Sequence, residues 1–119
     1  GLTLLVGSPG TMGINPFLFR TLPYDAVRDF AAVSHAVSFP QVMVVNPNGP
    51  IRSLADLLAA ARARPGALNY ASSGNSSTSH LAFELLRAAT GIDVVHVPFR
   101  GGTPAVQAVM ANEVQVALE

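Results

Sequence analysis

The chain contains no cysteine, no tryptophan and no lysine, and only 12% of its 119 residues are charged. Without cysteine it can form neither disulfides nor thiolate metal sites. Without lysine it cannot contain a phosphate loop of the Walker type. Seven arginines balance seven acidic residues, and they form no basic stripe interleaved with aromatic residues. We therefore expect no nucleic-acid partner.

Histidines and hydrophobic runs are also limited. The three histidines, at positions 35, 80 and 96, lie far apart without carboxylates at ligand spacing, so we expect no metal and no cofactor. No apolar run approaches the roughly 20 residues that cross a bilayer. Half of the residues are nevertheless hydrophobic, which is enough for a sizeable core in one domain or in two incomplete lobes.

Extended and helical segments alternate along the chain. The pattern predicts extended segments at 2–6, 32–38, 41–46, 68–71, 94–97 and 115–119. It predicts helices at 28–30, 54–64, 78–90 and 104–112, and a helix or an irregular segment at 15–22. Ser53 and Thr103 are expected to cap helices, and Gly91 to end one. Because most connections are too long for hairpins, the sequence predicts an α/β fold with parallel strands.

The most informative segment is the serine loop, which we define as residues 72–79, Ser-Ser-Gly-Asn-Ser-Ser-Thr-Ser. It lies between a predicted strand and a predicted helix, and ligands of parallel sheets bind beside such loops. The free N–H groups and the dipole of a helix start favour an anion. Residues 7–11 and 100–103 form two more loops rich in small residues. We therefore expect the loops to bind a carboxylate or another small anion.

Two other functions fit parts of the pattern. Ser72, Ser73 and Gly74 form half of the nucleophile elbow of a serine hydrolase, in which Ser72 would attack and a histidine would act as base. Asp93 could then orient His96. However, Tyr70 replaces the first glycine of the elbow, and several serines compete for the role. His96 also fits a hydrogen-bonded core histidine, and a purely structural interaction module remains a third reading.

Several motifs in sequence order resemble one family. They are Asn69-Tyr70-Ala71-Ser72-Ser73-Gly74-Asn75, His80-Leu81, and Val95-His96-Val97-Pro98-Phe99-Arg100-Gly101-Gly102-Thr103-Pro104-Ala105, preceded by Thr3-Leu4-Leu5, Gly10-Thr11, Ile14-Asn15-Pro16, Leu22-Pro23-Tyr24-Asp25, Asp29-Phe30 and Val44-Val45-Asn46-Pro47. Together they resemble the Bug-type receptors, which are the periplasmic solute-binding proteins of tripartite tricarboxylate transporters. The similarity covers essentially the whole chain.

The resemblance implies a two-lobed periplasmic-binding-protein-like fold of type II that captures a small carboxylate in the periplasm. It also implies delivery to a membrane permease, with no catalysis and no catalytic residue. Residues 1–46 would be part of the first lobe, 47–52 the crossing segment and 53–119 most of the second lobe. The expected ligand-binding residues are Ser8, Gly10 and Thr11 from the first lobe, and Ser72, Ser73, Gly74, Asn75, Ser76, Thr78, His80, Arg100, Gly101 and Thr103 from the second.

The chain departs from the family in length, because such receptors have about 300 residues. Both ends of the sequence read as core strands. We therefore expect a fragment that is truncated at both ends. Exposed strand edges at those ends could pair between chains, which would give a homodimer.

Overall fold

The structure is a computed structural model that describes residues 2–119. The chain divides into two compact units, with the boundary between Phe39 and Pro40. The predicted lobe boundaries, with the crossing at 47–52, remain a prediction.

The first unit contains little regular structure. A π-helical turn, η1 (Gly10–Ile14), continues directly into the short helix α1 (Asn15–Leu18). The strand predicted at 2–6 and the extended segment at 32–38 have no ladder, and 26–28 form a turn instead of a helix. The strand prediction at 2–6 was wrong because a strand requires a hydrogen-bonded neighbour, and residues 2–39 contain no strand to pair with. The helix prediction at 28–30 was wrong because Asp25 Oδ1 accepts the Val27 and Arg28 N–H groups and fixes a turn there. The extended backbone predicted at 32–38 is not contradicted.

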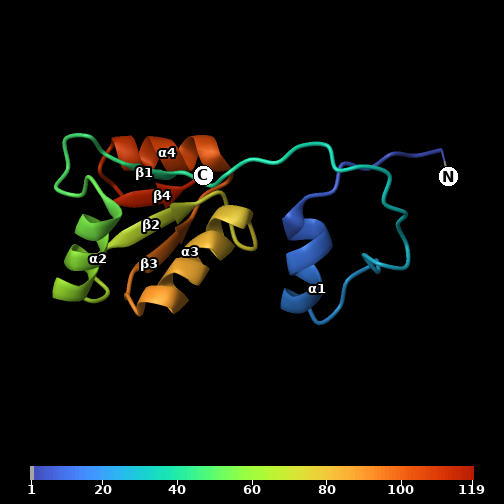
Figure 1. The fold of residues 1–119 in the computed structure, drawn as a ribbon, viewed down its shortest axis with the longest axis horizontal. Coiled ribbons are helices and arrows are strands. Elements are labelled where there is room, and N and C mark those ends of the chain that lie inside the picture. The colour runs from blue at the N-terminus through green and yellow to red at the C-terminus, as the bar shows by residue number, and fades with distance from the viewer. Residues whose placement is uncertain (1) are drawn as a thin grey trace. The chain divides into compact units, whose positions relative to one another are not determined.

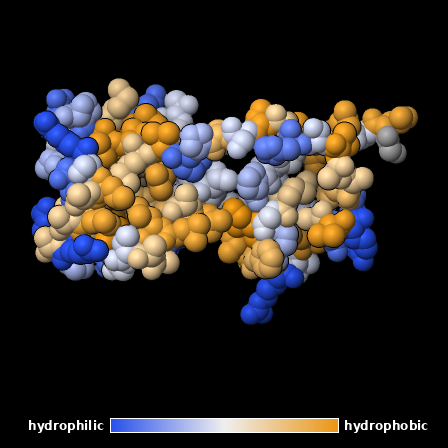
Figure 2. Space-filling model, in the orientation of Figure 1, coloured by the Kyte–Doolittle hydropathy of each residue, from blue (hydrophilic) through white to orange (hydrophobic). Residues whose placement is uncertain are grey.

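Apolar side chains cover much of the surface of this first unit (Figure 2). The most exposed of them, each more than four-fifths accessible, are Leu2, Leu4, Val6, Phe17, Val27 and Val33. Soluble proteins rarely leave so many large apolar side chains uncovered in one region.

The second unit contains a four-stranded sheet (Figure 1). Its strands are β1 (Met43–Val45), β2 (Asn69–Ser72), β3 (Val95–Pro98) and β4 (Val116–Leu118), in the spatial order β1-β4-β2-β3. β2 is parallel to both β3 and β4, and Tyr70 pairs with His96 on one side and Val116 on the other. β1 is antiparallel to β4. The predicted α/β class is confirmed, with one antiparallel edge strand.

Three helices cover this sheet. α2 (Leu54–Ala63) and α3 (Thr78–Thr90) lie on one face, and α4 (Gly102–Met110) lies on the other (Figure 1). Ser53 caps α2 by accepting from the Asp56 N–H, and Gly91 ends α3 in the left-handed conformation that favours glycine. No helix among residues 2–119 is long and apolar enough to span a membrane.

The core follows the alternation of side chains along the strands. Tyr70, Val116 and Leu118 point to the α2 and α3 face, where they pack with Leu57 and Phe83. The intervening alanines, Ala71 and Ala117, point to the other face and pack beneath α4 with Ala105, Ala108 and Val109. Small residues on that face let α4 approach the sheet closely.

Candidate functional site

The three parallel strands end at one edge of the sheet, which we call the carboxyl edge. The serine loop follows β2 there, residues 99–101 follow β3, and Glu119 follows β4. Two backbone hydrogen bonds join the first two segments: Phe99 N–H donates to the Ser72 carbonyl (2.9 Å) and Gly101 N–H to the Ser73 carbonyl (3.2 Å). The starts of α3 and α4 therefore lie beside each other at this edge.

Ser79, the last residue of the serine loop, connects other serines of the loop and is 1% exposed. Its Oγ accepts the Ser73 N–H at 3.0 Å and lies 2.9 Å from Ser73 Oγ and 3.0 Å from Ser77 Oγ. Ser77 caps α3, because its Oγ accepts the His80 N–H. The loop is therefore held in one conformation by its own hydroxyl groups.

The backbone of the loop is also specialised. Gly74 has a φ of 132°, and a Cβ at this position would lie 3.3 Å from the Phe99 carbonyl oxygen. Ser76 adopts a φ of 64°, which is uncommon for a residue other than glycine. Its N–H donates to His80 Nδ1 at 3.3 Å. His80 thus supports the turn that precedes its own helix.

Four aromatic rings stack in sequence from the core to this loop. Phe83 lies on Tyr70 with ring centroids 3.8 Å apart, Tyr70 on His96 (4.8 Å) and His96 on His80 (4.1 Å). Ser72 Oγ lies 2.6 Å from His96 Nε2. Burial, together with the nearby His80, lowers the pKa of His96. The neutral imidazole that results can accept the Ser72 hydroxyl proton.

A polar group anchors the far end of the Tyr70 ring. Its hydroxyl donates to Glu84 Oε1 at 2.6 Å, and Arg87 donates to the same oxygen at 2.7 Å. Burial and the adjacent Glu84 carboxylate raise the pKa of Tyr70, so the phenol stays protonated. Burial alone would raise the pKa of Glu84, but the hydrogen bonds from Tyr70 and Arg87 hold it below its ordinary value.

Glu119 brings a carboxyl group to the carboxyl edge. A Cβ on Gly102, the first residue of α4, would lie 2.8 Å from Glu119 Oε2. Burial raises the pKa of Glu119, and the hydroxyls of Ser79 and Ser73 oppose this in part. Its Oε1 is buried and receives no hydrogen bond of good geometry from residues 2–119.

The structure brings most of the second-lobe candidates together. Ser72, Ser73, Gly74, Ser76, Thr78, His80 and Gly101 lie in or beside the joined loops, and Asn75, Arg100 and Thr103 are exposed next to them. Thr103 does not cap α4, which begins two residues earlier than predicted, after Gly101 in a backbone conformation (φ 111°) that suits glycine. Ligand contact by these residues remains a prediction.

Sequence reasoning missed four residues of this arrangement. Ser77 and Ser79 were only part of a serine-rich run, and nothing in the run says which hydroxyl is buried. His96 was assigned to the core, and Glu119 has no sequence motif. Only the pairing of β4 beside β2 shows that Glu119 lies at the same edge as Ser73.

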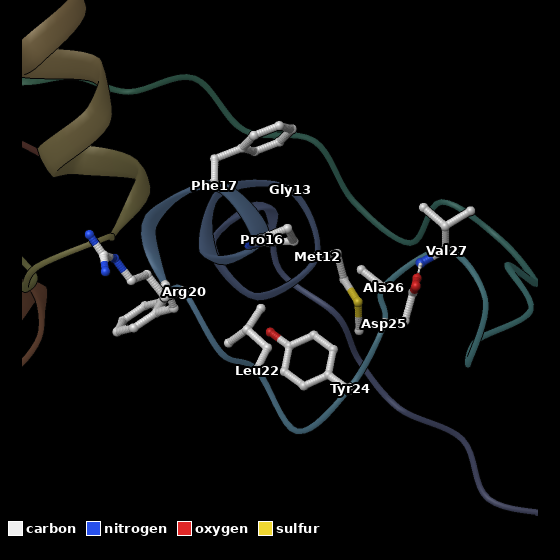
Figure 3. Close-up of a pocket in the computed structure, with 11 residues that line it drawn as sticks. Met12, Gly13, Pro16, Phe17, Arg20, Leu22, Tyr24, Asp25, Ala26 and Val27 are labelled. Atoms are coloured by element: carbon white, nitrogen blue, oxygen red, sulfur yellow. Dashed lines mark hydrogen bonds between the residues drawn. The ribbon is translucent and has the colours of Figure 1, made fainter.

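The first-lobe candidates lie in the other unit. Ser8 and Thr11 bond to each other, with Oγ and Oγ1 3.2 Å apart, and Gly10 starts η1. Tyr24 donates to the Thr11 carbonyl at 2.6 Å. Figure 3 shows a nearby pocket of about 380 Å³ whose walls include Met12, Leu22 and Tyr24. The three candidates themselves do not line this pocket.

The serine hydrolase reading receives no support as a whole. The close contact between Ser72 and His96 is one feature that it requires. However, the Ser72 side chain is fully buried, whereas a nucleophile elbow exposes its serine. Asp93, the expected partner of the histidine, instead lies 3.8 Å from Arg87. Residues 2–119 contain no group of three or more side chains suited to hold a metal ion.

Comparison with known proteins identifies the family. The family model "Tripartite tricarboxylate transporter family receptor" matches residues 1–119. A UPF0065 protein of Pseudomonas sp. strain P51, from the tcbD-tcbE intergenic region, is 38% identical over the whole chain, which covers 35% of that protein. The chain therefore spans about a third of the length of the curated relatives that it matches in full.

Two solved structures resemble this protein closely. Rpa4515 of R. palustris with adipate matches 95% of the chain with a TM-score of 0.87 and 34% identity, and the match covers 38% of that protein. MatC of Rhodopseudomonas palustris with bound malate matches 92% of the chain with a TM-score of 0.79 and 28% identity, and the match covers 37% of MatC. The chain belongs to the receptors of the tripartite tricarboxylate transporter family.

Proposed function

We propose that the protein captures a small carboxylate at the carboxyl edge of the second unit. The proposal rests on one observation. Hydrogen bonds join the serine loop, which leads into α3, to residues 99–101, which lead into α4, so that both helix starts lie at this edge. The structural relatives support it, because one was solved with adipate and another with malate. Both ligands are carboxylates, whereas the relatives give no support to hydrolysis by Ser72.

The physical basis is a set of donors that requires no charged clamp. Free N–H groups and hydroxyls of the joined loops would replace water around the ligand carboxylate, and two helix dipoles favour its negative charge. Since the loop is already fixed by the Ser73–Ser79 contacts, little ordering entropy is lost on binding.

In the full receptor, the loop that carries Ser8, Gly10 and Thr11 would close over the ligand from the first lobe. The loaded receptor would act in the periplasm, deliver its ligand to the membrane permease and catalyse no reaction. Family membership supports each of these steps. The homodimer predicted from exposed terminal strands is not part of the proposal, because β4 is paired on both sides, with β1 and β2, and residues 2–6 form no strand.

Calorimetric titration of the protein in its full natural length tests the proposal. Adipate and malate should bind with measurable heat, and Ser73→Ala should weaken binding by about 1–2 kcal/mol through the loss of a loop donor. Ser53→Ala, a matched serine change at the start of α2, should leave affinity unchanged. If no member of a panel of mono- and dicarboxylates binds, the result would favour a purely structural interaction module.

A further inference from the structure

The carboxyl group of Glu119 lies inside the proposed carboxylate site. Glu119 directly follows β4, the strand next to β2, so it leaves the sheet at the same edge as Ser73. Its Oε2 lies against Gly102 at the start of α4, and the hydroxyls of Ser79 and Ser73 are close enough to affect its titration. The helix start and the hydroxyls that would hold a ligand therefore face a carboxyl group of the chain itself.

A ligand carboxylate that binds in this space would lie beside the Glu119 carboxyl group. Two ionised carboxyl groups in one site repel each other, and such pairs usually share a single proton. The Glu119 Oε1 atom is buried and accepts no well-formed hydrogen bond from the described residues. An ionised carboxylate would leave this oxygen as an uncompensated buried acceptor, whereas protonation of the carboxyl group removes the charge and supplies a hydrogen-bond donor.

We propose that Glu119 is a specificity-determining residue that takes up a proton when the ligand binds and donates a hydrogen bond to the ligand carboxylate. This inference rests on the proposed function. The neutral acid adds a donor without adding charge, and the ionised form repels the ligand. The receptor would therefore bind carboxylates more tightly as the pH falls.

The surrounding groups favour this assignment. The serine loop and α3 face Glu119 with the hydroxyls of Ser73 and Ser79, and α4 faces it with Gly102. The titratable or charged groups on the adjoining segments are His80, Glu84 and Arg87 of α3, Tyr70 of β2, His96 of β3 and Arg100 before α4. Glu119 forms no ion pair with any of them in the described residues, and Val42, just before β1, pairs with it only through backbone hydrogen bonds. Protonation is therefore the simplest way to neutralise the charge of Glu119.

The test is calorimetry with adipate at pH 7.5 in buffers of different ionisation enthalpy, using the protein in its full natural length. The wild type should take up about one proton per adipate, and its Kd should rise up to tenfold per pH unit between pH 7 and 8.5. Glu119→Gln, whose amide keeps a donor, should bind without this uptake and with a nearly flat pH profile. Glu113→Gln makes the same change at an exposed turn and should behave like the wild type.

The outcomes separate the two proposals. If the wild type binds adipate without proton uptake, or if Glu119→Gln retains the uptake, the role of Glu119 is refuted while carboxylate binding stands. If Glu119→Gln folds but does not bind adipate, Glu119→Asp is the deciding variant because it keeps a carboxyl group. Adipate binding by Glu119→Asp without proton uptake would refute the proposed role of Glu119. If the wild type binds no carboxylate at any pH, the proposed function itself fails.

Discussion

Replacement of Ser79 by alanine should destabilise the protein, because this buried serine connects the other parts of the serine loop. The substitution removes the acceptor of the Ser73 N–H and two hydroxyl contacts, all between 2.9 and 3.0 Å. A buried donor left without a partner costs about 1–3 kcal/mol, and each lost hydrogen bond about 0.5–1.5 kcal/mol. Because Ser73 Oγ and Ser77 Oγ are less buried and can bond to water, we expect a total of about 2–3 kcal/mol.

Ser53→Ala is the matched control for this measurement. Ser53 also accepts one backbone N–H, that of Asp56 at 3.1 Å, but at the exposed start of α2. Loss of such a cap costs about 1 kcal/mol. Urea unfolding followed by far-ultraviolet circular dichroism suits both variants, since the chain has no tryptophan. If Ser79→Ala costs no more than Ser53→Ala, Ser79 does not organise the loop.

Three further predictions concern other parts of the second unit. Burial and His80 lower the pKa of His96. The contribution of His96 to the stability of the fold is therefore complete above its unfolded pKa of about 6.5 and is lost as the pH falls from there toward its folded pKa. His96→Gln should flatten the fall in Tm between pH 7.5 and 5.5. Asn46→Ala should cost about 2–3 kcal/mol in urea, because the buried amide donates to the Val109 and Met110 carbonyls; an effect below 1 kcal/mol would contradict this. Gly91→Ala should cost about 1–2 kcal/mol in the same assay from left-handed backbone strain alone, since its Cβ would meet no atom within 4 Å.

Local sequence features predicted the elements that are fixed locally. The bounds of α3, 78–90, were predicted correctly because the serine run before it and Gly91 after it determine its two ends. The start of α4 was misplaced by two residues, since the Gly101 N–H is held by the Ser73 carbonyl from a distant segment. Sequence spacing does not reveal such a contact.

The same limit applies to the site. The serine loop was identified because it follows a buried strand and precedes a helix, which a sequence shows directly. Glu119 was not, because its position depends on β4 lying between β1 and β2, a pairing that joins residues far apart in the chain. The strand predicted at 2–6 failed for the converse reason: its apolar pattern was present, but a pairing strand was not found in the described residues.

A crystal structure of the full-length protein with adipate tests the central claim most directly. We predict that one adipate carboxylate lies within hydrogen-bond distance of the Ser73 hydroxyl, the first N–H groups of α4 and the Glu119 carboxyl group. Adipate bound elsewhere, with this edge of the sheet unchanged, would contradict the assignment of the carboxyl edge as the ligand site.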